Sequence, residues 1–253
     1  MFVLEESLKL FSGISEKKEK WLKRNNIKIW DDILKNGENF FNKNDFKKLK
    51  KEINHAKKHL YRKDIKYFQK KLDSEDYYLL YYDFKDKACF LDIETTGLGD
   101  ESDITIIGIA DSIGKYRVYV NGINLNEKNL MKYLKNFHIL ITFYGSRFDI
   151  PFIKKKYPKL GKKLSKMVHV DLCFLGHRIG FKGGLKLIEK QVGIERENEI
   201  SGLTGYDAVK LWNRYKSGDI NSLITLIRYN RSDVLNLLKL IDIEIKMMKD
   251  FYS

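Results

Sequence analysis

The sequence predicts an α/β fold in which helices flank one mixed sheet, preceded by a small helical region. Short apolar runs separated by turn residues follow one another between residues 88 and 120, as strands of a meander do. Strand and helix patterns then alternate up to residue 170. Before residue 84 and after residue 171 only helical spacing recurs. We therefore expect a helical, basic region over residues 1–83 and the α/β domain over residues 84–253.

The composition is that of a globular chain. Its 253 residues are 43% hydrophobic and 13% aromatic, which suffices for a buried core and excludes general disorder. No apolar run approaches the ~20 residues of a membrane span, and the first residues lack the pattern of a secretion signal. Two cysteines, Cys89 and Cys173, are too few for a disulfide framework or a structural zinc site. We expect a cytoplasmic protein that does not bind membranes.

Turns and periodicity predict the N-terminal helices. The turn at residues 12–15 opens a helix, and around Gly13 it resembles a degenerate helix-hairpin-helix, a module that grips nucleic-acid backbones. A plain pair of helices is the alternative. A second helix begins at Asn44, the expected N-cap, because apolar residues then recur every three or four positions. His55 and His59 lie one turn apart there, but no acidic residue completes a zinc motif, so we interpret them as structural.

The elements of the second region follow in chain order. Strands are predicted at 88–94, 104–112 and 116–120, then a helix at 126–136 and a strand at 138–143. A helix over 146–157 is expected to end at Pro158. A short strand at 168–170 precedes four helices, at 171–178, 185–192, 206–215 and 219–249.

Positive charge is concentrated in two stretches. The net charge is +14, from 48 Lys and Arg against 34 Asp and Glu. Residues 43–71, expected to be helical, carry a net +9, and residues 154–166, with seven lysines and no acid, a net +7. Clustered positive charge attracts polyanions such as nucleic acid. The same charges also suit a solvated helix face, so composition leaves both interpretations open.

Acidic residues occur at three places that the fold would bring together. Asp92 and Glu94 end the first strand and point to one side, because strand residues alternate. Two carboxylates on one face of a buried strand are costly unless a cation balances them. Asp149 lies in the first turn of the expected helix after a later strand, and Tyr229 and Asp233 lie one turn apart on the last helix. Each fragment alone also fits a structural role.

Together these fragments form an ordered set of motifs. Asp-Ile-Glu-Thr-Thr-Gly at 92–97 is the most specific, followed by Gly-x-x-Phe-Asp-x-Pro at 145–151 and Tyr-x-x-x-Asp at 229–233. The set resembles the DnaQ-like 3′–5′ exonucleases of ribonuclease H-like fold, in the DEDDy subclass, which has a tyrosine in the third motif. It is most similar to the YprB-type stand-alone predicted exonucleases. That family usually has asparagine before the motif-two glycine, where this chain has Tyr144.

The resemblance implies an activity and a site. It implies hydrolysis of nucleic acid to nucleoside 5′-monophosphates with two divalent ions, Mg²⁺ or Mn²⁺, because hard cations take oxygen ligands. Tyr229, protonated near its ordinary pKa of about 10, would orient the attacking water. The implied metal ligands are Asp92, Glu94, Asp149 and Asp233. The implied substrate contacts are Thr95, Thr96, Leu98, Phe148, Lys154, Lys155 and Lys156.

The sequence leaves other functions on the same fold open. These are a structure-specific or endonucleolytic nuclease and a nucleic-acid-binding protein with a weakened site, although four intact acids argue against the second. The expected partner is a single strand or a 3′ end, and nothing in the sequence separates DNA from RNA. The sequence predicts neither a protein partner, nor an oligomeric state, nor a pathway. We expect the presence of Tyr144 in place of the usual asparagine to affect how the substrate is positioned.

Overall fold

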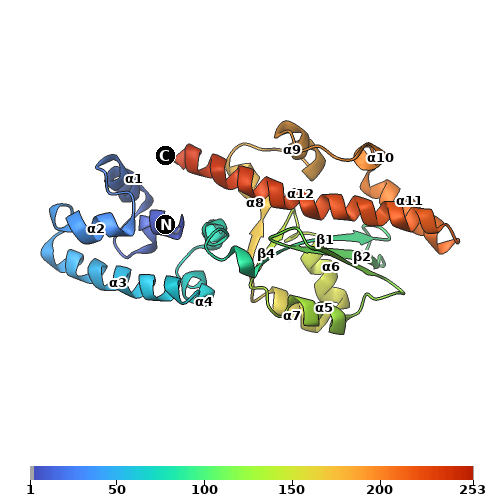
Figure 1. Ribbon diagram of the computed structural model, residues 1–253, viewed down its shortest axis with the longest axis horizontal. Coiled ribbons are helices and arrows are strands. Elements are labelled where there is room, and N and C mark those ends of the chain that lie inside the picture. The colour runs from blue at the N-terminus through green and yellow to red at the C-terminus, as the bar shows by residue number, and fades with distance from the viewer. Residues whose placement is uncertain (1–2, 253) are drawn as a thin grey trace. The chain divides into compact units, whose positions relative to one another are not determined.

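The computed structural model describes residues 3–252, with side chains up to residue 250. The chain forms two compact units, of which the first ends at Lys85 and the second begins at Asp86. Figure 1 shows the helical first unit in blue and the second unit, with its sheet, from green to red.

The first unit is built from short helices around aromatic side chains. Trp30, Phe68 and Phe84 are fully buried, and the Trp30 indole donates a 3.0 Å hydrogen bond to the carbonyl of Ser7. The α-helices are α1 (Glu16–Arg24), α2 (Trp30–Asn36), α3 (Lys43–Tyr61) and α4 (Ile65–Gln69). Single 3-10 turns lie between or beside them at Val3–Glu6, Leu8–Leu10, Gly37–Asn39, Ser74–Leu80 and, at the junction of the units, Lys85–Lys87.

Three expectations for this unit are corrected. Only 3-10 turns precede the bend at Gly13, whose φ is +78°, so the first helix of a helix-hairpin-helix is missing from residues 3–15. The N-cap of α3 is Asn42, whose side chain accepts a 2.9 Å bond from the amide of Asp45. The basic helix does not continue through residues 43–71, because the backbone turns at Lys63, with φ +54°, before α4.

The histidine pair on α3 forms a hydrogen-bonded chain. The Nε2 atoms of His55 and His59 lie 3.1 Å apart, and His59 Nδ1 lies 2.8 Å from a carboxylate oxygen of Asp64. The ring of His59 also stacks on Tyr67, with centroids 4.0 Å apart. The pair therefore has structural contacts of its own.

The second unit contains one mixed sheet of five strands in the order β3-β2-β1-β4-β5. β1 pairs antiparallel with β2, which pairs antiparallel with β3, whereas β4 and β5 run parallel to β1. The register of the β1–β2 pair shifts between Glu94 and Thr95. The strands are β1 (Ala88–Thr95), β2 (Ile104–Asp111), β3 (Tyr116–Val120), β4 (Ile139–Thr142) and β5 (Val168–Asp171).

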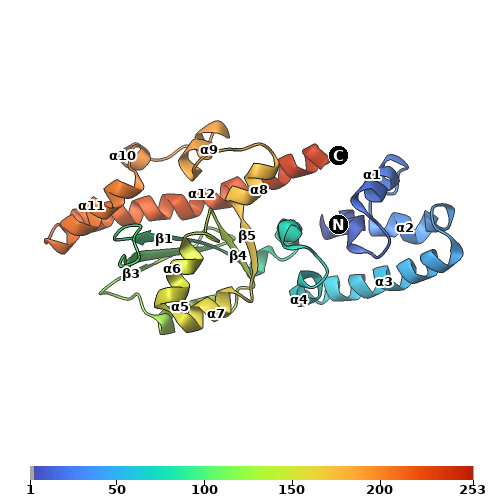
Figure 2. The ribbon, with the colours of Figure 1, turned by 180° about the vertical axis from the view of Figure 1, so that it is seen from behind.

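Helices cover both faces of this sheet, as Figures 1 and 2 show. One face carries α5 (Glu127–Leu134), α6 (Asp149–Lys156) and α7 (Pro158–Leu164). The long α12 (Ile220–Tyr252) crosses the other face. Against α12 pack α8 (Leu172–Arg178), α9 (Leu185–Gln191), α10 (Asn198–Ser201) and α11 (Gly205–Lys216). No helix in residues 3–252 is long and apolar enough to cross a membrane.

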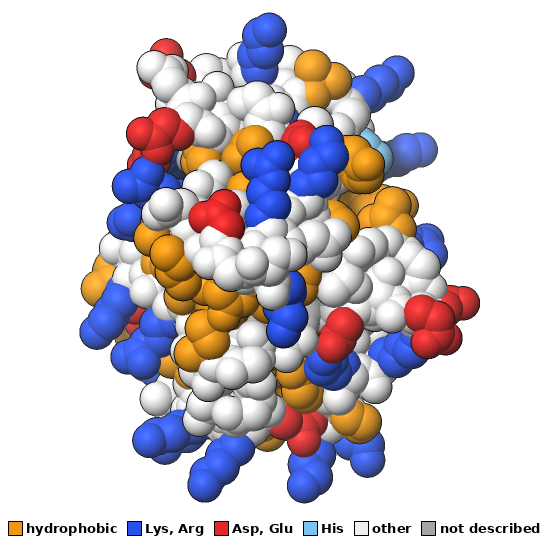
Figure 3. Space-filling model, turned by 90° about the vertical axis from the view of Figure 1, so that its right-hand side faces the viewer, with side chains coloured by type: hydrophobic (Ala, Val, Ile, Leu, Met, Phe, Trp, Pro, Cys, Tyr) orange, Lys and Arg blue, Asp and Glu red, His pale blue; other side chains and the backbone are white. Residues whose placement is uncertain are grey.

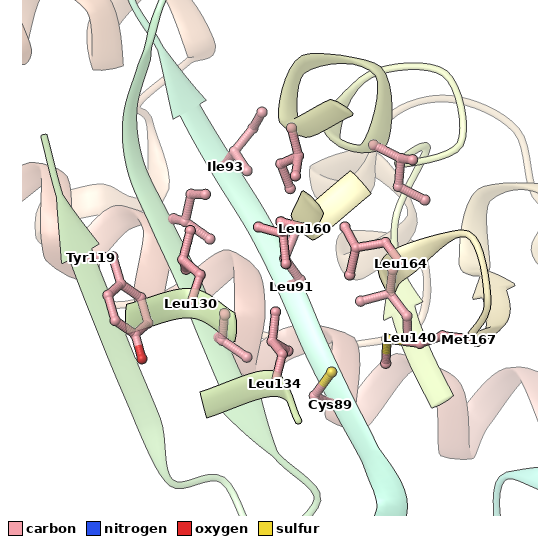
Figure 4. Packing of buried hydrophobic residues seen from close by; sticks show 14 of the residues in the cluster. Cys89, Leu91, Ile93, Tyr119, Leu130, Leu134, Leu140, Leu160, Leu164 and Met167 are labelled. Carbon is pink, nitrogen blue, oxygen red and sulfur yellow. The ribbon is translucent and has the colours of Figure 1, made fainter. Parts of the chain in front are cut away.

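The alternation along β1 decides what each face of the sheet contains. Cys89, Leu91 and Ile93 point into the core beneath α5, α6 and α7 (Figure 4). The residues between them therefore face α12. Asp92 and Glu94 consequently lie on the side of the sheet that α12 covers.

The region between β4 and β5 differs from the sequence expectation. α6 begins at Asp149 instead of residue 146, because the Asp171 carboxylate holds residues 144–148 in a turn, with bonds from the amides of Tyr144 (2.7 Å) and Ser146 (3.0 Å). Pro158 begins a further helix, α7, at its first position, where the missing amide hydrogen costs nothing. The short α10 was not expected.

Candidate active site

Three carboxylates meet where β1 faces α12. Asp92, Glu94 and Asp233 each offer an oxygen atom, and these atoms all lie within 4.8 Å of one another. Glu94 and Asp233 are buried, whereas Asp92 is partly exposed. The two positions on β1 share a face because they are two residues apart, and α12 carries the third acid across to them.

The fourth acid, Asp149, lies behind β1 and outside this group of three. It is buried at the first position of α6, and its Oδ1 accepts a 3.1 Å hydrogen bond from the amide of Ile93. That bond fixes the start of α6 to the strand between Asp92 and Glu94. Asp149 is near enough for its charge to raise the pKa of both.

Burial and mutual repulsion raise the pKa values of all four acids. The pKa of Asp92 rises well above its usual range, first because the surrounding protein removes much of the water from its carboxylate and then because Asp233 and Glu94 are close. Glu94 shifts in the same direction for the same reasons. Burial raises the pKa of Asp149 to about 7 and that of Asp233 to about 6. Without a cation, the cluster therefore retains protons at neutral pH.

Asn230 connects the carboxylates and was not singled out by the sequence. Its side-chain amide donates to Asp92 Oδ2 at 2.8 Å and to Glu94 Oε1 at 3.3 Å, and its oxygen accepts a 2.8 Å bond from the hydroxyl of Tyr116. Asn230 is fully buried. It fits there because β2 has Gly108 opposite, where an added Cβ would lie 1.8 Å from Asn230 Oδ1.

Arg196 and Glu189 form a second unexpected part of the site. Arg196 Nη2 lies 2.5 Å from Asp233 Oδ1, and the guanidinium also contacts both carboxylate oxygens of Glu189, at 2.5 and 2.7 Å. Asn236 donates a 3.0 Å bond to Glu189. Nothing in their spacing links residues 189, 196 and 233, because the loop between α9 and α10 brings Arg196 to α12.

Tyr229 lies one turn before Asp233 and is buried. Burial, followed by the charges of Asp233 and Glu94, raises the pKa of its hydroxyl above the ordinary value of 10.0. The expectation of an unperturbed pKa is thus wrong, while the expected protonation state is unchanged. Lys186 Nζ lies 4.5 Å from the centre of the Tyr229 ring.

The expected substrate contacts near β1 differ in their surroundings. Leu98 is 85% exposed just beyond the strand. Thr95 and Thr96 already have hydrogen bonds, since Thr95 Oγ1 donates to the carbonyl of Gly97 at 2.6 Å and Thr96 Oγ1 accepts from the amide of Asp103 at 2.9 Å. Phe148 packs against the core and against Phe152, at 4.8 Å between ring centres, so only part of its ring is exposed.

The lysines after motif two are not equivalent. Lys154 is exposed at the end of α6, whereas Lys155 donates to the carbonyl of Asp100 and Lys156 pairs with Asp103. On the face shown in Figure 3, basic side chains lie both at the margin and across the middle, with acidic side chains among them. Lys155 and Lys156 thus fasten α6 to the loop after β1.

Tyr144, the departure from the usual motif, has a left-handed backbone with φ +58°. Asparagine tolerates that conformation better than other non-glycine residues. The backbone amide of Tyr144 donates a hydrogen bond to Asp171, and the Tyr144 ring is 48% exposed beside Phe174. The backbone therefore gives a physical reason why asparagine is usual at this position.

The donor set of the cluster suits a divalent cation. The three gathered side chains are all carboxylates, the oxygen ligands that Mg²⁺ and Mn²⁺ prefer. Their raised pKa values reflect, first, removal of the carboxylates from water and, for Asp92 and Glu94, repulsion by neighbouring acids, and a bound cation would offset both effects. The residues present thus fit a metal centre.

Comparison with known proteins agrees with the fold. A protein of Bacillus subtilis (strain 168), the uncharacterised YprB, is 28% identical over 177 residues, which are 62% of this chain and 41% of YprB, so the chain spans less than half of that relative. The family B DNA polymerase from the hyperthermophilic archaeon Pyrobaculum calidifontis shares the fold, with a TM-score of 0.52 and 19% identity over 62% of this chain and 24% of the polymerase chain.

The family assignment comes from the sequence of the second unit. The profile of the RNase H superfamily matches residues 89–244. This stretch is more than half of the chain and contains the four acids and Tyr229. The chain belongs to the RNase H superfamily.

Proposed function

We propose that the chain is a metal-dependent 3′–5′ exonuclease that hydrolyses nucleic-acid phosphodiester bonds to nucleoside 5′-monophosphates. The observation that carries the proposal is the convergence of Asp92, Glu94 and Asp233 within 4.8 Å, on the fold of the RNase H superfamily. The order of the acids and of Tyr229 along the chain, which resembles that of the DEDDy exonucleases, supports the reaction and its direction.

The acids would hold two ions, Mg²⁺ or Mn²⁺. Glu94 and Asp233 would hold the first with Asp92, and Asp149 would help to hold the second. Two bound ions stabilise the attacking and leaving oxygens of an in-line displacement at phosphorus. Asn230 fixes the carboxylates of Asp92 and Glu94 with its amide hydrogens, so both ligands are oriented before a cation arrives.

Tyr229 would orient the water that attacks the terminal phosphodiester. Its pKa lies above the ordinary value of a phenol, which favours the protonated hydroxyl. A phenol hydroxyl both donates and accepts hydrogen bonds, so it can hold a water without binding the cation itself. Its place one turn before Asp233 puts it next to a metal ligand.

The nucleic acid would approach along the exposed residues beyond β1 and along α6. Leu98, at 85% exposed, and the partly exposed ring of Phe148 would contact the terminal nucleotide, with Thr95 and Thr96 beside it. Lys154 would contact phosphate. A single strand or a 3′ end is the substrate that this arrangement favours.

The test is digestion of single strands of DNA and RNA that are labelled at either end. With Mn²⁺, a 5′-labelled strand should shorten one nucleotide at a time, while a 3′-labelled strand should release labelled mononucleotide at once. Chelator should abolish both. Internal fragments without mononucleotide would instead favour an endonuclease, and full turnover in chelator would contradict a metal mechanism.

A further inference from the structure

A fixed cation already lies beside the acidic cluster. Arg196, in the segment between α9 and α10, places Nη2 2.5 Å from Asp233 Oδ1. Asp233 is also one of the three carboxylates whose oxygens gather within 4.8 Å. The guanidinium and any divalent cation held by Asp233 therefore depend on the same carboxylate.

Arg196 is held firmly in this position. Its side chain is 5% exposed, and two of its nitrogens contact the two carboxylate oxygens of Glu189, at 2.5 and 2.7 Å. Asn236 in turn donates a 3.0 Å bond to Glu189. Such a two-point contact fixes a planar guanidinium, and burial strengthens the effect of its charge on neighbouring groups.

The contacts of Arg196 are nevertheless incomplete. The remaining guanidinium nitrogen, Nη1, is buried without a hydrogen-bond partner among the described side chains. Arg196 also lines a cleft between the segment 195–199 and α12, together with Asn236 and Arg228.

Charge balance indicates what this contact does. Without a cation, ionising one carboxylate of the cluster beside its acidic neighbours has a large free-energy cost. Arg196 Nη2, at 2.5 Å from Asp233 Oδ1, places a positive charge directly against that carboxylate. Arg196 thus does for Asp233 part of what a divalent cation would do.

We propose that Arg196 is a built-in counter-ion of Asp233 that competes with the divalent cation for this carboxylate and so lowers the cation affinity of the cluster. This inference rests on the proposed metal-dependent function and concerns how that function is regulated. Exchange between the guanidinium and the cation at Asp233 sets how often the site holds a metal ion. The opposite role, in which Arg196 merely orients Asp233 as a ligand, makes the opposite prediction.

The test measures Mn²⁺ binding to the full chain by titration calorimetry. Arg196→Gln should bind Mn²⁺ at least about tenfold more tightly, because a positive charge in contact with a ligand is removed. Arg228→Gln is the matched control. Arg228 is exposed and pairs with Glu199 at 2.5 Å, so its loss removes the same charge without touching Asp233. Its affinity should stay within about twofold of the wild type, since exposed charges are screened.

A double variant guards against misfolding. Arg196→Gln leaves Glu189 buried and unpaired, whereas Glu189→Gln combined with Arg196→Gln removes both charges of the pair. This variant should also bind Mn²⁺ more tightly, and Mn²⁺ should raise its unfolding temperature more than that of the wild type. If the wild type binds Mn²⁺ and the folded variants bind it no more tightly, the proposal is overturned. If neither the wild type nor any variant binds Mn²⁺, the proposed function itself fails.

Discussion

Gly108→Ala tests the close approach on which the orientation of the acids depends. A Cβ at this position would lie 1.8 Å from Asn230 Oδ1 and 2.9 Å from a ring carbon of Tyr116. Asn230 cannot retreat into solvent, since it is fully buried and bonds both Tyr116 and Asp92. The methyl group must therefore displace the amide that holds the carboxylates.

The expected cost follows from two contributions. Overpacking of a close-fitting interior costs about 1–3 kcal/mol. Loss of the bonds from Tyr116 to Asn230 and from Asn230 to Asp92 adds about 1 kcal/mol each. The free energy of unfolding should therefore fall by about 3–5 kcal/mol. Affinity for Mn²⁺ should fall as well, because Asp92 and Glu94 lose their common donor.

Urea unfolding followed by circular dichroism measures this change. Gly205→Ala is the control, because an added Cβ there meets nothing within 4 Å; its stability should change by less than about 0.5 kcal/mol. A Gly108→Ala chain as stable as the control, with unaltered Mn²⁺ binding, would refute the role given to Asn230.

Three further predictions concern chemistry, pH and charge. Tyr229→Phe should lower the single-turnover rate by about 10²–10⁴-fold while Mn²⁺ affinity stays the same; unchanged rates would make Tyr229 structural. Folding raises the pKa of Asp149 from 3.8 to about 7 and that of Asp233 to about 6. In chelator the chain should therefore lose stability as pH rises from about 4 to 7, and Mn²⁺ should bind more tightly over the same range. Thermal unfolding that shows a gain in stability with pH in chelator would contradict this sign. Finally, three exposed lysines of α6 and α7 can be replaced with Gln, namely Lys154, Lys159 and Lys162. The slope of log binding constant against log salt concentration for a single strand should then flatten by up to about two units. An identical slope would mean that these lysines form only a solvated surface.

The sequence predicted those parts of the site that local periodicity determines. Alternation along β1 put Asp92 and Glu94 on one side, and helical spacing put Tyr229 and Asp233 on one face. The mixed sheet followed from the order of strand and helix patterns, and the RNase H-like fold from the resemblance of the motifs. The placements on β1 and on α12 each need only a few neighbouring residues, whereas the sheet and the fold needed the order of patterns and motifs along the second region.

The sequence could not predict contacts that depend on distant parts of the chain. Asn230 meets Tyr116 across 114 positions, and their bond requires the absence of a side chain at Gly108. Arg196 reaches Asp233 from a loop without periodicity. The N-cap of α3 was misplaced because Asn42 and Asn44 are both good capping residues, and the packed structure selects the first.

Hydrolysis by Asp92→Asn is the measurement that tests the central claim most directly. Asparagine keeps the shape of the side chain but removes the negative charge that Asp92 would offer to a divalent cation. The variant should fold and bind a labelled single strand as the wild type does, yet with Mn²⁺ degrade it no faster than the wild type does in chelator. Asp100→Asn, an exposed acid in the loop after β1, should keep full activity. An Asp92→Asn chain that digests the strand at close to the wild-type rate would contradict the claim that these acids carry a metal-dependent reaction.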